Sequence, residues 1–283
     1  MGASRSTCLV CGAPYRPSRL AGLVECGKCG FVSANADLSD AEMESLYSRD
    51  YFHGGEYLDY GEEEKSLREN FRARIATLLN VAPDLAVRDL FEIGCAYGFF
   101  LDEVSNLVRA ASGIDVSEHA VRHAREVLRV DAQQGDYLNI DFPRKFGVIV
   151  MWDTIEHLQR PDLFIAKASR DLHQGGLLAL TTGDIGSLNA RLRGSKWRMI
   201  HPPTHLHYFS VHSIKYLLDR HGFDTLHVSH PGISRNLQSI FYYVFAWRMK
   251  QSALYDILKR QRFSRLRATV NLFDIMYVIA RKR

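Results

Sequence analysis

The stretch that decides the fold is Leu90-Phe91-Glu92-Ile93-Gly94-Cys95-Ala96-Tyr97-Gly98, followed by Phe99-Phe100-Leu101. An apolar run ends in an acidic residue, passes through a turn of small residues and reopens as a helix. Such a turn lets the backbone approach a ligand closely, and the first N–H groups of the helix point toward that ligand. The spacing is not the dinucleotide-binding fingerprint, and the Lys-Ser/Thr pair of a phosphate loop is absent.

Apolar runs and amphipathic helices alternate around this stretch. The predicted strands cover residues 89–93, 111–114, 132–134, 146–152, 177–182, 225–230 and 275–281. The alternation predicts an α/β fold with a doubly wound, seven-stranded and mostly parallel sheet that helices cover on both faces. In such sheets ligands bind beyond the carboxyl ends of the strands, so the residues at those ends are the candidate site.

Acidic residues stand at the ends of three consecutive predicted strands. The first strand ends at Glu92, the second ends at Asp115, and Asp136-Tyr137 follows the third. A carboxylate at Asp115 can accept hydrogen bonds from both hydroxyls of a ribose. Asp136 and Tyr137 suit the amino group and the ring face of an adenine. The fourth strand ends in Trp152-Asp153-Thr154-Ile155-Glu156-His157-Leu158.

As an ordered set, these residues resemble the class I S-adenosylmethionine-dependent methyltransferases over about residues 65–230. The set consists of Glu92, Gly94, Gly98, Asp115, Asp136 and the pair Glu156-His157-Leu158 and Gly175-Gly176-Leu177. The resemblance implies a Rossmann-like methyltransferase domain with S-adenosylmethionine as cofactor. It implies that the turn at 94–98 holds the methionine part, that Asp115 holds the ribose and that Asp136 and Tyr137 read the adenine. The expected cofactor-binding residues are Glu92, Gly94, Cys95, Ala96, Gly98, Asp115, Val116, Asp136, Tyr137, Trp152 and Asp153. We interpret Cys95 as a packing residue, because no neighbouring base is evident.

Two C-x-x-C-G turns, Cys8 to Gly12 and Cys26 to Gly30, lie near the N-terminus. Each turn can place two thiolates on one side of a tight loop, and four thiolates make a closed tetrahedral zinc site. We therefore predict a structural Zn²⁺ bound by Cys8, Cys11, Cys26 and Cys29. The segment is too small for an apolar core of its own, so metal binding supplies its folding energy.

The chain divides into three predicted parts. Residues 1–36 form the zinc knuckle, and residues 37–64 form a helical, aromatic-rich segment that we interpret as a lid, with Ser39 or Asp40 as N-cap. Residues 65–283 form the methyltransferase domain, with a basic helical insert at about 235–268. From residue 233 to the end there are eleven Lys or Arg and two Asp, so the insert suits an anionic partner, such as a membrane surface or a nucleotide- or lipid-linked substrate. The alternative is a helix that covers the cleft and keeps a solvated outer face.

The loop His201-Pro202-Pro203-Thr204-His205-Leu206-His207-Tyr208-Phe209-Ser210 precedes a predicted helix that Ser210 caps. Its end resembles the histidine-bearing segment of methyltransferases that act on sugars and other small molecules. We expect His207 or His205 to be the catalytic base. We also name Glu156 and His157 as catalytic candidates that orient the acceptor. The alternative is that they bind a divalent ion together with a loop histidine.

The composition is that of an ordinary globular protein, with 46% hydrophobic and 24% charged residues among 283. No run approaches the ~20 apolar residues of a membrane span, and the N-terminus lacks the apolar centre of a signal peptide. We therefore expect a cytoplasmic location, where the five cysteines remain reduced.

These features together favour a methyltransferase that acts on a small molecule, namely a sugar, a glycan precursor or a natural-product intermediate. The alternative is an RNA methyltransferase that grips RNA with the zinc knuckle and the basic insert. Against RNA, the fourth strand ends in Trp152-Asp153-Thr154 and not in the Asn/Asp-Pro-Pro-Tyr loop of adenine-modifying enzymes. We do not expect a nucleic-acid partner. A scaffold without activity would have no need of the acidic set at the strand ends.

Overall fold

The computed structural model describes residues 6–35, 63–242, 245, 250–259 and 266–283. The predicted lid at 37–64, with its N-cap candidates Ser39 and Asp40, lies almost wholly outside the described residues.

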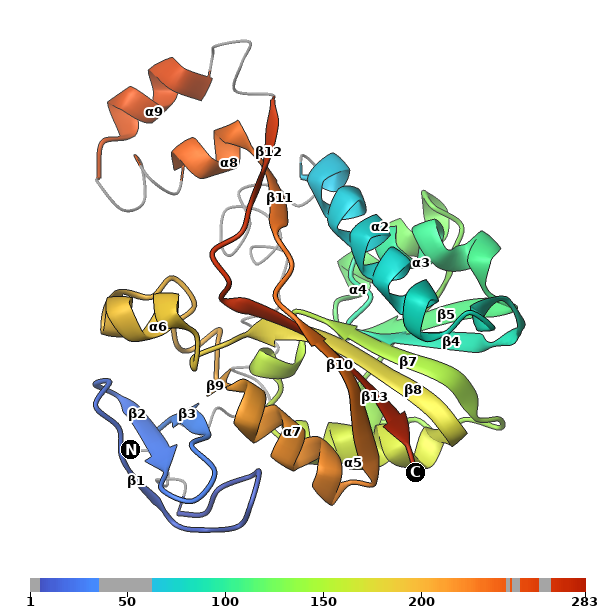
Figure 1. Cartoon of the computed structure of the whole chain (residues 1–283). Coiled ribbons are helices and arrows are strands. Elements are labelled where there is room, and N and C mark those ends of the chain that lie inside the picture. The colour runs from blue at the N-terminus through green and yellow to red at the C-terminus, as the bar shows by residue number, and fades with distance from the viewer. Residues whose placement is uncertain (1–5, 36–62, 243–244, 246–249, 260–265) are drawn as a thin grey trace.

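A seven-stranded sheet forms the centre of the molecule (Figure 1). Its strands lie in the order β10 (Phe223–Ser229), β13 (Ile275–Lys282), β8 (Leu172–Gly183), β7 (Phe146–Trp152), β4 (Asp89–Ile93), β5 (Ala110–Asp115) and β6 (Asp131–Gln134). The five strands from β4 to β8 are parallel to one another, whereas β13 is antiparallel to both β8 and β10. The predicted doubly wound, mostly parallel fold is confirmed. The chain runs outward from β4 to β6 and then returns to β7, so strand order reverses between β4 and β7 and creates a ligand site there.

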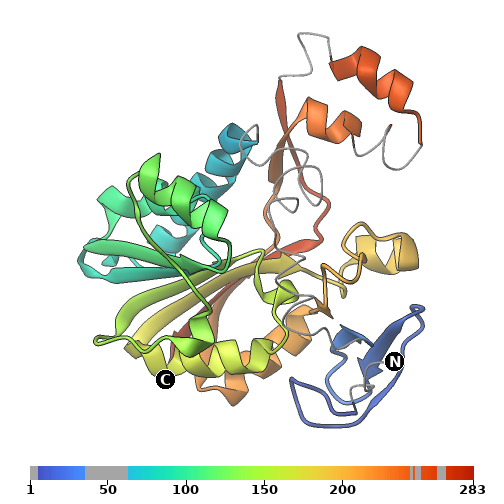
Figure 2. The same cartoon turned by 180° about the vertical axis from the view of Figure 1, so that it is seen from behind.

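Helices cover both faces of this sheet (Figures 1 and 2). On one face lie α2 (Glu64–Val81), α3 (Phe99–Val104) and α4 (Glu118–Glu126), and on the other lie α5 (Pro161–Asp171) and α7 (Val211–Arg220). Each face has its own apolar layer. Phe71, Leu101 and Val121 belong to the first, and Ile165, Leu217 and Phe223 to the second. The helices are amphipathic because each buries one stripe against the sheet.

Short helices connect these elements. They are η2 (Leu85–Val87), η3 (Ser105–Leu107), η4 (Tyr137–Asn139), η5 (Ile155–His157), α6 (Leu188–Arg193) and η6 (Gly194–Lys196). The start of α7 agrees with the prediction from sequence. Ser210 accepts a hydrogen bond from the Ser213 N–H, and the Ser213 hydroxyl bonds back to the Ser210 N–H. This capping box fixes where the histidine loop ends.

The N-terminal ribbon is joined to the methyltransferase-like body through a shared sheet. Its strands β1 (Tyr15–Pro17), β2 (Leu23–Cys26) and β3 (Val32–Ala34) are antiparallel, and the two-residue strand β9 (His207–Tyr208) adds to β3. The Arg220 side chain of α7 also donates a hydrogen bond to the Val10 carbonyl. The ribbon thus completes its sheet with a piece of the histidine loop, which spacing alone did not predict.

The basic insert begins and ends in a β-hairpin, which our prediction of a helical insert did not include. β11 (Ile233–Asn236) pairs with β12 (Arg267–Val270), and α8 (Leu237–Phe241) and α9 (Ser252–Lys259) lie between them. The hairpin is fixed to α2, because Asn70 exchanges hydrogen bonds with the backbone of Ser234, at 2.7 and 3.1 Å. Within the described ranges, every helix is too short or too polar to cross a membrane.

Candidate functional site

The turn after β4 needs glycine at two positions. Gly94 has φ +79° and Gly98 has φ +82°, a region that strains residues with a Cβ. A Cβ on Gly94 would lie 2.6 Å from Thr154 Oγ1, and one on Gly98 would lie 2.9 Å from Ala124 Cβ. The backbone therefore passes close to the end of β7 at one glycine and to α4 at the other. This close approach produces the tight turn that the sequence predicts.

Asp115 connects this turn to the end of β5. Its two carboxylate oxygens accept hydrogen bonds from the Ala96 N–H at 2.8 Å and from the Ser117 N–H at 2.9 Å. Burial raises the pKa of Asp115, while these backbone bonds act in the opposite direction. A carboxylate has about four acceptor positions, so Asp115 can still accept from a ribose hydroxyl.

Glu92 is the buried carboxylate beneath the turn, with 2% of its surface exposed. Burial raises its pKa well above the ordinary value, and the charge of Asp115 adds to this effect. Its Oε2 has no hydrogen-bond partner among the described residues. A buried acceptor of this kind requires a cation or a donor. The ammonium of the methionine part of S-adenosylmethionine supplies one, so these residues fit the cofactor that the sequence implies.

The structure buries the rings of two predicted cofactor residues, and cofactor binding at these positions stays a prediction. Tyr137 is 2% exposed, its ring lies among Phe91, Phe142 and Phe164, and its hydroxyl donates to Asp171 at 2.6 Å. Trp152 is 6% exposed, and its ring packs on Phe100 and Tyr277. Both rings belong to the core, so the Tyr137 ring does not present to adenine the face that we expected.

The remaining predicted residues at this edge have distinct environments. Asp136 caps η4 by accepting from the Leu138 N–H, and Val116 is 54% exposed beside Asp115. Asp153 accepts from Arg74 at 2.7 Å and from Thr181 at 2.9 Å. Burial opposes ionisation of Asp153, but the Arg74 charge prevails and lowers its pKa.

Cys95 is buried, and burial raises the pKa of its thiol. This is the environment of a packing residue and not of a nucleophile.

A second group of polar side chains lies between η5 and the histidine loop. Glu156, His157 and His205 are 2%, 7% and 4% exposed, and one ligand atom from each lies within 4.8 Å of the others. Burial lowers the pKa of His157 to about 4 and moves that of His205 well below its ordinary value. Both imidazoles are therefore neutral at pH 7.

The two predicted bases have different neighbours. The ring of His205 lies against His157 and His201, with centroids 4.6 and 3.8 Å apart. His207 is 1% exposed and lies against Phe31 of the ribbon, at 5.4 Å. Both line one narrow crevice together with Glu156 and Thr182. The structure places both histidines beside the carboxylate and leaves the choice of base as a prediction.

One pair of functional candidates was missed in the sequence. The side chains of Asp184, which follows β8, and His230, which follows β10, form a hydrogen bond with 2.9 Å between Oδ2 and Nε2. Asp184 is buried, and the His230 side chain is 28% exposed. The carboxyl ends of both strands lie on the same side of the sheet as that of β4, so the strand-end rule could have found the pair. A buried carboxylate that orients a partly exposed histidine is an arrangement suited to a general base.

With this geometry established, similarity to known proteins becomes informative. Residues 64–228 match the methyltransferase domain family. The chain belongs to this family. A probable S-adenosylmethionine-dependent methyltransferase of Mycolicibacterium smegmatis is 31% identical over 114 residues, which are 40% of this chain and 44% of that protein. A ubiquinone biosynthesis O-methyltransferase of Thiobacillus denitrificans is 28% identical over 131 residues, 44% of this chain and 56% of that protein.

The solved structures agree with this membership at the level of the fold. A magnesium protoporphyrin IX methyltransferase of Synechocystis PCC 6803, with bound SAM, has a TM-score of 0.53 and 13% sequence identity, covering 88% of this chain and 100% of that one. The methyltransferase domain thus has the Rossmann-like fold that the sequence predicts. The chain spans about half the length of the curated relatives it matches.

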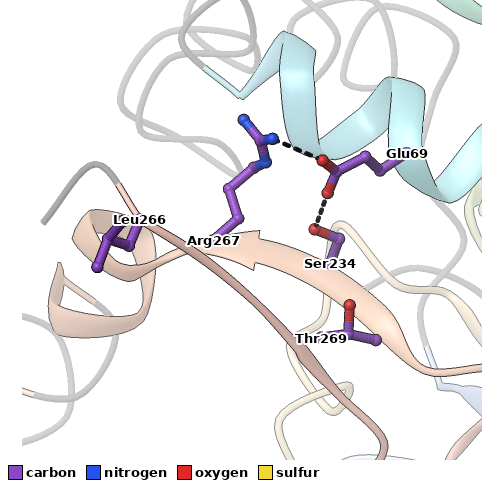
Figure 3. A pocket seen from close by; sticks show the side chains of 5 residues that line it. All are labelled: Glu69, Ser234, Leu266, Arg267 and Thr269. Atoms are coloured by element: carbon purple, nitrogen blue, oxygen red, sulfur yellow. Dashed lines mark hydrogen bonds and ion pairs between the residues drawn. The ribbon is translucent and has the colours of Figure 1, made fainter. Parts of the chain in front are cut away.

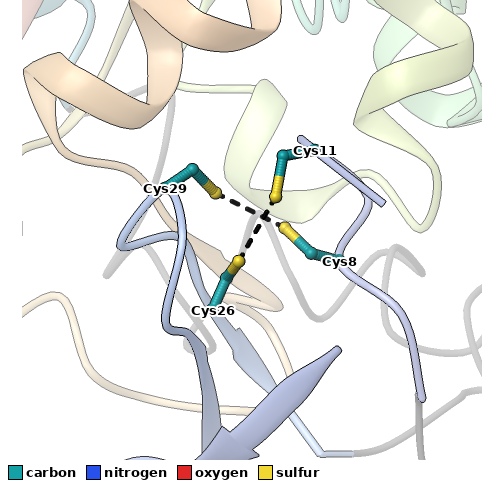
Figure 4. A group of neighbouring side chains, drawn as sticks. All are labelled: Cys8, Cys11, Cys26 and Cys29. Carbon is teal, nitrogen blue, oxygen red and sulfur yellow. Dashed lines mark hydrogen bonds between the residues drawn. The ribbon is translucent and has the colours of Figure 1, made fainter. Parts of the chain in front are cut away.

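Beside the methyltransferase domain, the four ribbon cysteines converge on one point (Figure 4). The Sγ atoms of Cys8 and Cys29 are 3.5 Å apart, and those of Cys11 and Cys26 are 3.3 Å apart. Four sulfurs at about 2.3 Å from a zinc ion lie about 3.8 Å from one another. Donor type, number and spacing therefore fit a structural zinc ion, which stays a prediction.

A cavity of ≈ 310 Å³ opens between α2 and the β11–β12 hairpin (Figure 3). Glu69 accepts from Arg267 at 2.7 Å and from the Ser234 hydroxyl at 2.6 Å. The charges that line the cavity are thus paired with each other, and we assign it no ligand.

Proposed function

We propose that the protein transfers a methyl group from S-adenosylmethionine to a small-molecule acceptor: a sugar, a glycan precursor or a natural-product intermediate. The observation that carries this proposal is the geometry at the carboxyl ends of β4 and β5. Glu92, Gly94 and Asp115 lie around one tight turn, and a buried carboxylate oxygen there requires a cation or a donor. These are the acceptors that a cationic, ribose-containing ligand needs.

Each residue has a defined part in cofactor binding under this proposal. The Gly94–Gly98 turn lies along the methionine portion, and Glu92 accepts from its ammonium. Asp115 accepts from the ribose hydroxyls, and Asp136 and Val116 bind the adenine. S-adenosylmethionine supplies the methyl group as an electrophile. The Arg74–Asp153 pair, with its 2.7 Å contact, holds the end of β7 in place beside it.

The acceptor needs a positioned nucleophile and, where it is a hydroxyl, a group that takes its proton. We propose His207 or His205 as that group, as the sequence suggests, and the Asp184–His230 pair as a further one. The similarity to an O-methyltransferase supports an oxygen nucleophile. The H-x-H-Y-F-S loop, similar to that of sugar methyltransferases, supports a sugar.

The described part of the basic insert gives RNA binding no support. Arg235 pairs with Glu63 at 2.8 Å, and Arg267 pairs with Glu69 at 2.7 Å. These hairpin cations are therefore neutralised by α2 and do not form a stripe for phosphates.

Calorimetric titration with S-adenosylmethionine tests the proposal. Asp115→Asn should weaken cofactor binding by about 10- to 100-fold, because it removes a charged acceptor worth ~1.5–3 kcal/mol. Asp131→Asn is the matched control, since Asp131 is exposed at the amino end of β6, away from the carboxyl ends of the strands. Equal affinity of Asp115→Asn and the wild type would refute the site. Methyl transfer to nucleotide sugars, lipid-linked sugars and small RNAs, measured with labelled cofactor, then identifies the acceptor class.

A further inference from the structure

We propose that Glu156, His157 and His205 bind a divalent first-row transition-metal cation, at a site distinct from the four cysteines. This inference rests on the proposed function, since it revises the role of base that is proposed there for His205. One ligand atom from each lies within 4.8 Å of the others, and all three residues are at least nine-tenths buried. Two imidazoles and one carboxylate are the donor set of many zinc and iron sites.

The hydrogen bonds of the two histidines fix the tautomer that a metal ion requires. His157 Nδ1 lies 2.9 Å from the Thr204 carbonyl, and His205 Nδ1 lies 2.9 Å from the Met199 carbonyl. A carbonyl oxygen only accepts, so in both rings Nδ1 carries the proton and Nε2 carries the lone pair. A backbone carbonyl that fixes the tautomer through the other ring nitrogen is the usual support of a metal-binding histidine.

The backbone holds the two halves of the site together. Glu156 and His157 lie on η5, directly after β7, whereas His205 comes from the loop nearly fifty residues later. The Leu206 N–H donates to the Glu156 carbonyl at 2.9 Å and so fixes the loop against η5. The donors are thus positioned by the fold before any ion binds, which lowers the cost of ordering them on binding.

The space between these side chains suits an ion and not an organic molecule. The crevice that Glu156 and His205 share with Thr182 and Trp197 has no volume that would hold a water molecule. A cation bound by nitrogen and oxygen at about 2.0–2.2 Å lies between its ligands and needs no such volume. A nitrogen bound to a cation takes no proton. The proposal therefore removes His205 from the candidate bases and leaves His207 and His230.

Cobalt titration of the protein loaded with one equivalent of zinc tests the site. Zinc first fills the four-cysteine site, and thiolates retain Zn²⁺ against Co²⁺. The wild type should then bind one further equivalent of Co²⁺, with visible d–d absorption and without thiolate-to-metal charge transfer. Glu156→Gln and His157→Gln should each weaken this binding at least about tenfold, since even a residue that supports a ligand contributes that much. His212→Gln, at an exposed position of α7, should bind like the wild type.

Two results overturn the proposal: a zinc-loaded wild type that takes up no cobalt, or Glu156→Gln and His157→Gln proteins that bind cobalt as the wild type does. Thermal unfolding of each variant verifies that the protein tested is folded, and Glu156→Gln preserves side-chain volume. Titration with S-adenosylmethionine on the same samples separates the two proposals. Cobalt binding without cofactor binding would refute the proposed function alone, and cofactor binding without cobalt binding would refute the cation site alone.

Discussion

Ser33 Oγ lies 3.0 Å from His207 Nδ1, in a sheet that joins the cysteine ribbon to the histidine loop. The two residues are directly opposite in the β3–β9 pair, and their exposed fractions are 0% and 1%. Phe31, two residues earlier, lies against the same imidazole. The ribbon therefore determines where one of the candidate bases lies.

Ser33→Ala tests this relationship. Removal of a buried hydrogen-bond partner should lower the free energy of unfolding by ~1–3 kcal/mol. If His207 is the base, the variant should lower kcat more than it raises KM, and the pH–rate profile should shift. Ser33→Thr keeps the hydroxyl and should restore the profile. A Ser33→Ala enzyme with an unchanged rate and pH profile would exclude His207 as the base.

Loss of the ribbon metal should affect the loop as well. Replacing Cys8 and Cys26 by Ser should release one zinc per chain, because two of four ligands are lost. Since β3 pairs with β9, amide hydrogen exchange at residues 206–208 should become faster in this variant. Metal analysis that finds no zinc in the wild type would contradict the ribbon assignment.

Gly94→Ala tests the close approach at the turn. The alanine would have φ +79°, and its Cβ would lie 2.6 Å from Thr154 Oγ1, so the turn must move. We expect at least about tenfold weaker binding of S-adenosylmethionine, measured by calorimetry, with a loss of stability above the ~1 kcal/mol of a left-handed residue. Gly175→Ala is the matched control, because Gly175 has φ +73° and open space around it. Equal effects of the two substitutions would argue against the turn as a ligand site.

Glu92 predicts a pH dependence of cofactor binding. Its pKa is raised by burial and by Asp115, so the folded protein retains the proton above the ordinary pKa of about 4.5. The stability associated with this group is complete below that ordinary pKa and decreases as the pH rises toward the folded pKa. A cationic ligand favours the carboxylate, so binding should release a proton and tighten with rising pH through this window. Calorimetry in buffers of different ionisation enthalpy measures the release. Glu92→Gln should abolish it, and a variant that releases the same proton would show that another group titrates.

The Asp184–His230 pair provides the fifth prediction. If His230 takes the acceptor proton, His230→Gln should lower kcat by ~10²–10⁴-fold and leave cofactor affinity unchanged. Asp184→Asn keeps the volume but removes the charge at 2.9 Å, and should lower kcat without abolishing activity. Full activity of His230→Gln would return the role of base to the histidine loop.

Much of the fold was predictable because the sheet is built from local patterns. Residues 89–93 and 146–152 were predicted as strands with the bounds that β4 and β7 have. The beginning of β8 was missed by five residues, since Leu172 to Gly176 contains polar and glycine residues. The burial of the Tyr137 and Trp152 rings was not predicted, because a strand-end rule locates a residue along the chain but does not tell which side of the sheet its ring enters.

By itself, the sequence determined the family, the turn at Glu92 to Gly98, the acidic residues at the strand ends and the four cysteines. Those features are recognised from residues that lie a few positions apart, and such short spacings constrain the local backbone geometry. Tertiary structure alone decided that Ser33 faces His207, that Asp184 meets His230 and that His205 joins Glu156 and His157. These contacts link residues 46 to 174 positions apart. Only the packing of the ribbon, the sheet and the loop against one another sets such long-range distances.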